Sequence, residues 1–199
     1  MNVIKGGVRL AMVLAAALLI CANQAEAASP MKDIEKLTPP RTIVCYFDGD
    51  KLEELVINAR GRLTFLFADS KLADALKRQR KAEYDRGGSS GIPSQVFAYA
   101  TQSKKKHALF IVRVQALKKW NFDPSMFSVG GYFPVKEDII TGVSDNPAYE
   151  LRFGERELYK DYNGFIGFFV PAENVKPGET ISLGYAEDRV DWQVPDKNQ

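Results

Sequence analysis

Residues 42–67 read TIVCYFDGDKLEELVINARGRLTFLF, and this stretch decides the fold class. Residues 42–47, 52–59 and 63–67 are rich in the β-branched, aromatic and aliphatic side chains that suit a pleated surface. Tight-turn signals, Asp48-Gly49 and Arg60-Gly61, separate the three runs. Residues 52–57 also fit a helix, but they are few and lie between two turns. We therefore predict a β-meander.

A helix is expected next, over residues 70–86. Ser70 can cap its N-terminus, and Gly87-Gly88 would end it. Its apolar side chains form one thin stripe at helical spacing, namely Leu72, Ala75, Leu76 and Ala82. Most other side chains are charged, so we expect a surface helix on the outside of the sheet structure.

The rest of the chain alternates short apolar runs with turn residues. We expect a hairpin from residues 95–101 and 107–117, with 108–112 as a central strand packed on both faces. Further strands are expected at residues 139–143, 149–153, 165–170, 180–185 and 190–194. Short strands at regular spacing predict a mainly β protein, an antiparallel β-sandwich with one surface helix.

Residues of the C-terminal third carry a resemblance to a known class of domain. Gly167-Phe-Phe-Val-Pro171, Val175-Lys-Pro-Gly-Glu179 and Ile181-Ser-Leu183, with Tyr185 and Trp192, resemble the closing strands of exported bacterial immunoglobulin-like domains. The resemblance covers about thirty residues and lacks the Cys…Trp…Cys framework of antibody domains. It implies an immunoglobulin-like sandwich and leaves the function open, because this fold supports many activities.

The first 27 residues have the order of a secretory signal peptide. Lys5 and Arg9 precede an apolar run of about 13 residues, and Ala25-Glu26-Ala27 offers a cleavage site. A membrane-spanning helix needs about 20 apolar residues, so we expect cleavage after Ala27 rather than an anchor. The predicted organisation is a signal peptide (1–27), a Pro-containing tether (28–40) and one globular β domain (41–199). The predicted location is periplasmic or secreted.

The composition of the mature chain limits the classes of partner that we expect for it. Without residues 1–27 it would carry 25 basic and 24 acidic side chains, a balance that does not favour nucleic acid. We expect no membrane span after cleavage. Cys45 would be the only cysteine, so the domain has no internal disulfide, and its apolar neighbours predict a buried, inert thiol.

The candidate catalytic and metal patterns are weak. Residues 87–91 fit G-x-S-x-G, but a helix precedes them and the single histidine, His107, begins an apolar strand. One histidine cannot build a multi-histidine metal site. Asp48 and Asp50, with Glu53 and Glu54, offer calcium ligands without the EF-hand register. We assign no catalytic residue, metal or cofactor, and read the basic side chains of the helix as a solvated face.

Aromatic side chains in Pro- and Gly-punctuated segments are the remaining candidates. They either plug the ends of the core or form a ligand-binding surface. The ligand-binding candidates are Trp120, Phe122, Tyr132, Tyr159 and Tyr162.

The favoured hypothesis is an exported, soluble, non-catalytic binding or interaction module of the bacterial envelope, with an unknown protein or small ligand as its partner. One alternative is an envelope-acting enzyme, whose carboxylates would be Asp48, Asp50, Glu155 or Glu157. The other is a structural or assembly subunit.

Overall fold

The computed structural model describes residues 37–52, 55–84, 106–144 and 146–196. Its larger sheet has five antiparallel strands in the order β1-β4-β5-β10-β8. The strands are β1 (Thr42–Phe47), β4 (Gly61–Phe67), β5 (His107–Ala116), β8 (Ile139–Ile140) and β10 (Asn163–Pro171). As predicted, β5 is central, and Leu109, Phe110 and Val112 are fully buried.

A second antiparallel sheet has the order β12-β11-β7, and two smaller pairs, β2-β3 and β6-β9, lie outside both sheets. The strands are β2 (Asp50–Leu52), β3 (Leu55–Ile57), β6 (Trp120–Phe122), β7 (Phe127–Val129), β9 (Arg156–Leu158), β11 (Thr180–Tyr185) and β12 (Asp188–Gln193). Five 3₁₀ turns complete the description, at Pro39–Arg41, Pro124–Met126, Lys136–Asp138, Pro147–Tyr149 and Ala172–Asn174.

The main hydrophobic core lies between the two larger sheets. Phe127 of β7 packs on Phe65 of β4 and on Phe168 of β10, with ring centroids 5.6 and 5.3 Å apart. Trp192 of β12 packs on Phe110 of β5 at 6.1 Å. The mainly β, antiparallel sandwich class is therefore confirmed, while the immunoglobulin-like connectivity stays a prediction.

The predicted helix forms as α3 (Ser70–Tyr84), but its N-cap differs. The Asp69 carboxylate accepts a hydrogen bond from the Leu72 N–H at 2.9 Å, so Asp69 is the capping residue rather than Ser70. Ala73 of α3 shares a buried cluster with Leu109, whose side chain faces away from the main core. The start of the helix therefore contacts the outer face of the five-stranded sheet.

Three strand predictions are wrong in detail. Residues 52–59 were expected to form one strand of a meander, yet β2 and β3 pair with each other and β1 pairs directly with β4. Residues 149–153 form no strand beyond a bridge from Glu150 to Phe165. In the expected run 139–143, only Ile139–Ile140 is a strand.

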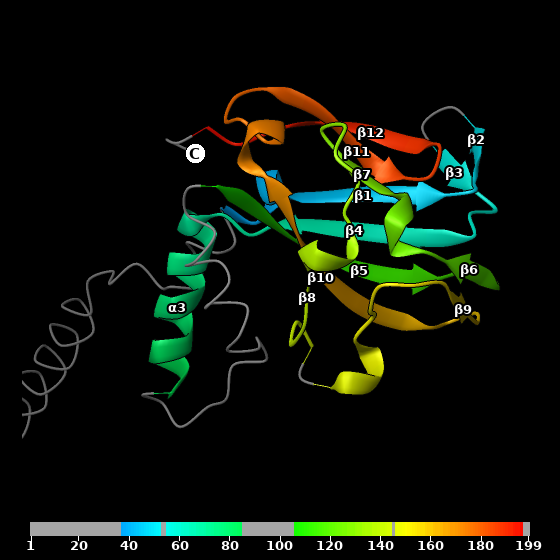
Figure 1. Ribbon diagram of the computed structural model, residues 1–199, viewed down its shortest axis with the longest axis horizontal. Coiled ribbons are helices and arrows are strands. Elements are labelled where there is room, and N and C mark those ends of the chain that lie inside the picture. Colours follow the sequence, from blue (N-terminus) through cyan, green and yellow to red (C-terminus); the bar gives the residue numbers. More distant parts are fainter. Residues whose placement is uncertain (1–36, 53–54, 85–105, 145, 197–199) are drawn as a thin grey trace, which may run out of the picture.

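The structure also separates the two ends of the sandwich. In Figure 1, α3 lies at one end, whereas β2, β3, β6 and β9 gather at the opposite end. Strand β1 runs between these ends, from α3 toward β2 (Figure 1). We call the end formed by β2, β3, β6 and β9 the open end.

Several predictions fall outside the described residues. These are the signal peptide, Glu53 and Glu54, the G-x-S-x-G pattern at 87–91 and the expected strand at 95–101. Among the helices within the described ranges, none combines the length and the apolar character that a bilayer crossing requires.

Candidate functional site

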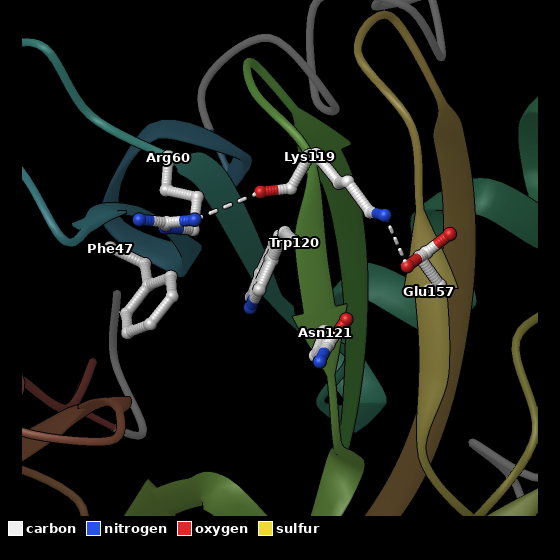
Figure 2. A pocket seen from close by; sticks show the side chains of 6 residues that line it. All are labelled: Phe47, Arg60, Lys119, Trp120, Asn121 and Glu157. Atoms are coloured by element: carbon white, nitrogen blue, oxygen red, sulfur yellow. Dashed lines mark hydrogen bonds and ion pairs between the residues drawn. The ribbon is translucent and has the colours of Figure 1, made fainter.

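A pocket of about 460 Å³ lies at the open end of the sandwich (Figure 2). This volume falls within the range of about 300–1,000 Å³ that is typical of small-molecule sites. Two aromatic and four polar side chains line the pocket, and these are Phe47, Arg60, Lys119, Trp120, Asn121 and Glu157.

Four separate chain segments bring these side chains together. Phe47 ends β1, and Arg60 immediately precedes β4 in the turn that leads back from β3. The β6-β9 pair supplies the other wall, with Asn121 directly opposite Glu157. Residues from distant parts of the chain therefore share one pocket because β6 and β9 close over the same end of the core.

Trp120 forms the floor of the pocket. Its ring stacks on Phe47 with centroids 5.1 Å apart and meets the rings of Phe122 and Tyr185 edge-on at 5.2 and 5.0 Å. The indole N–H lies beside the Tyr185 hydroxyl without meeting hydrogen-bond geometry. Only 2% of Trp120 is exposed, so this residue closes the core and offers the pocket little more than a ring edge.

Two ion pairs form the rim. Arg60 Nε lies 2.7 Å from Asp48 Oδ2, and Arg60 Nη1 donates to the Lys119 carbonyl at 3.1 Å. Lys119 Nζ lies 2.6 Å from Glu157 Oε2 (Figure 2). The hydrogen bond from Lys119 lowers the pKa of Glu157 and raises the pKa of Lys119. Both side chains therefore stay ionised at neutral pH.

Tyr159 extends this rim beyond the pocket. It is 64% exposed, and Lys119 Nζ lies 5.7 Å from its ring centroid. A hydrogen bond to Glu157 raises the pKa of the Tyr159 phenol. Tyr159, Lys119 and Glu157 thus form one linked polar group beside Trp120.

The five predicted aromatic candidates do not form one surface. Trp120 lines the pocket and Tyr159 adjoins it, but Phe122 is fully buried in the core. Phe122 faces inward because β6 places it two residues from Trp120, on the same side of the strand. Trp120 and Phe122 are buried, in agreement with the alternative prediction that these aromatic side chains fill the end of the core.

Tyr132 and Tyr162 lie in other surroundings. The Tyr132 hydroxyl donates to Asp138 Oδ2 at 2.6 Å, and this bond raises the pKa of Tyr132 to about 12. Burial raises the pKa of Tyr162, whose ring lies 5.3 Å from the Arg156 guanidinium carbon. Neither side chain lines the pocket above Trp120, which we call the Trp120 pocket.

The four candidate carboxylates are also dispersed. Asp48 is paired with Arg60, and Asp50 accepts a hydrogen bond from Asn58 at 3.0 Å. Glu157 lines the Trp120 pocket, whereas Glu155 lines a second depression of about 290 Å³. Within the described ranges, no three His, Cys, Asp or Glu side chains gather as a metal site would require.

Cys45 is buried, as predicted. It is 1% exposed, and its Sγ lies 3.6 Å from the Asp188 carbonyl oxygen. Burial raises the pKa of this thiol to about 11, and the nearby Asp188 carboxylate adds to the shift. The thiol therefore stays protonated and inert at neutral pH.

Sequence reasoning missed four of the six pocket residues. Phe47 was assigned only to a strand, and Arg60 only to a turn. Lys119 and Asn121 belong to no motif, because their role follows from the pairing of β6 with β9. Comparisons with protein-family models, curated proteins and solved structures gave no match, so the site rests on its own geometry.

Proposed function

We propose that this chain is an exported, non-catalytic binding module of the bacterial envelope, and that its ligand occupies the Trp120 pocket. The observation that carries the proposal is the lining of this pocket, in which an aromatic floor meets four polar side chains at the end of the sandwich. A concave site of this volume with a few convergent polar groups suits a small, polar ligand.

The ionisation of the rim argues against general-acid catalysis. A general acid needs a carboxyl group that holds its proton near the working pH, and this requires a raised pKa. The pKa of Glu157 is lowered instead, because Lys119 donates a hydrogen bond to its carboxylate. Asp48, the other rim carboxylate, is held by Arg60.

Export is tested by the intact mass of the protein recovered from the periplasm or the culture medium. The proposal predicts a chain that begins at Ala28. A mass that still includes residues 1–27 would contradict signal-peptide cleavage.

Binding is tested by native mass spectrometry of the mature protein after incubation with a small-molecule extract of the envelope. We expect a bound species that a K119M/N121A variant loses and an E179Q variant keeps. Glu179 makes a comparable exposed ion pair with Lys176, at 3.6 Å, and does not line the pocket. If wild type and both variants retain the same species, the ligand does not occupy this pocket.

The same incubation tests the absence of catalysis. Liquid chromatography of the extract before and after exposure to the protein should show unchanged components. Time-dependent consumption of one component that depends on Glu157 would favour the enzyme alternative.

A further inference from the structure

The charges of the pocket rim are already matched with one another. Arg60 is neutralised by Asp48 at 2.7 Å, and Lys119 is neutralised by Glu157 at 2.6 Å. An ionic ligand would have to break one of these pairs to gain its own partner. The rim therefore favours a ligand without net charge.

The same rim offers donors and acceptors side by side. Lys119 contributes N–H groups, and Glu157 contributes carboxylate oxygens. Asn121 adds a carboxamide that both donates and accepts, and this residue is exposed. Figure 2 shows Asn121 next to Trp120 on β6, on the side toward Glu157 of β9. A hydroxyl group matches such a lining, because it also donates and accepts.

The floor adds a small apolar surface. Phe47 is only partly buried, and its ring stacks on Trp120. Aromatic rings at the base of a polar site provide contact area without a hydrogen-bonding demand. A ligand that suits the whole pocket therefore carries several neighbouring hydroxyl groups and one apolar face.

We infer that the Trp120 pocket binds a neutral saccharide of one or two pyranose rings. This inference rests on the proposed function and specifies its ligand. The C–H face of the sugar lies against Phe47 and the edge of Trp120. Its hydroxyl groups bond to Asn121, Lys119 and Glu157, and the two ion pairs remain in place.

Isothermal titration calorimetry of the mature protein tests the ligand class with three pure probes. N,N′-diacetylchitobiose serves as the neutral disaccharide, glucuronate as the anionic sugar and glycylglycine as the zwitterionic peptide. We expect measurable binding of diacetylchitobiose only. In N121A the affinity for this probe falls about tenfold, the usual effect of losing hydrogen bonds to one polar side chain. In E179Q the affinity is unchanged.

The other outcomes overturn the saccharide assignment. Binding of glucuronate or glycylglycine in preference to the neutral sugar, with loss in N121A, shows a pocket for charged ligands and leaves the proposed function intact. Diacetylchitobiose binding that N121A and K119M both retain places the sugar elsewhere. If no probe binds while the envelope extract still yields a pocket-dependent species, the ligand is not a simple neutral sugar.

Discussion

The indole ring of Trp120 lies directly against the backbone of Gly61. A Cβ atom at position 61 would lie 2.4 Å from Trp120 Cζ3, far inside van der Waals contact. Gly61 opens β4, so the turn that leads into this strand and the floor of the pocket depend on the same close approach. The pocket and the end of the core are thus one packing unit.

We therefore expect Gly61→Ala to destabilise the protein by about 1–3 kcal/mol, the usual cost of overpacking. Urea denaturation followed by circular dichroism measures the change. The double variant G61A/W120F should be less destabilised than the sum of the two single variants, because the smaller ring relieves the clash. Additive effects would show that the two residues do not compete for the same space.

A second prediction concerns Arg41 and Asp69, which link the start of β1 to the start of α3. Arg41 is fully buried, and its Nη2 lies 2.7 Å from Asp69 Oδ2. Asp69→Asn keeps the helix cap but leaves the guanidinium without its counter-ion, so we expect a loss of about 3 kcal/mol in unfolding free energy.

Asp48→Asn is the matched control for this charge removal. Asp48 and Arg60 are about half exposed, and Asn tolerates the positive φ of 50° at position 48. The Asp48→Asn variant should lose no more than about 1 kcal/mol of unfolding free energy. Equal losses in both variants would contradict a special role for the buried pair.

The Cys45 thiol should resist modification in the folded protein. Because it is buried and its pKa is raised to about 11, we expect negligible reaction with Ellman's reagent at pH 8. In 8 M urea the mature chain, which keeps only Cys45, should react with one equivalent of the reagent. Rapid stoichiometric labelling of the native protein would show that the β1 strand opens readily.

Tyr132 should titrate at unusually high pH. Its hydrogen bond to Asp138 raises its pKa to about 12, against about 10 for a free tyrosine. The folded pKa lies above the unfolded one, so this contribution to stability is complete below pH 10 and is lost as the pH rises through about 12. Carbon-13 NMR of the tyrosine Cζ atoms follows the titration. In Asp138→Asn the pKa of Tyr132 should fall toward 10, and identical titrations in both proteins would refute the assigned cause.

Local sequence patterns were sufficient to predict much of the fold. The bounds of β1 and β11 agree with the sequence prediction because turn residues delimit both runs. The three-residue strands β6, β7 and β9 were not foreseen, since their pairing joins residues such as Asn121 and Glu157 that are distant in the chain. A three-residue strand carries too little periodicity to be recognised locally.

The candidate site was harder to predict for a related reason. An aromatic residue in a Gly- and Pro-rich segment has the same local pattern whether it plugs the core or contacts a ligand. Trp120 fills the end of the core and also lines the pocket, whereas Tyr159 stays exposed. Asp69 rather than Ser70 caps α3, and Asp69 also pairs with the buried Arg41, a contact that sequence alone does not reveal.

The chain's two tryptophans allow the most direct test of the central claim. Trp120 lies under the pocket, whereas the indole N–H of Trp192 donates to the Pro40 carbonyl at 2.8 Å, next to the opposite end of β1. The measurement is the pair of indole N–H signals in a ¹⁵N–¹H spectrum of the mature protein, assigned with a W192F variant and recorded during addition of envelope extract. Binding in the pocket predicts a saturable shift of the Trp120 signal, with Trp192 unmoved and the response lost in N121A. A shift of Trp192 alone, or a Trp120 response that N121A leaves unchanged, would contradict the assignment of the ligand site to the open end.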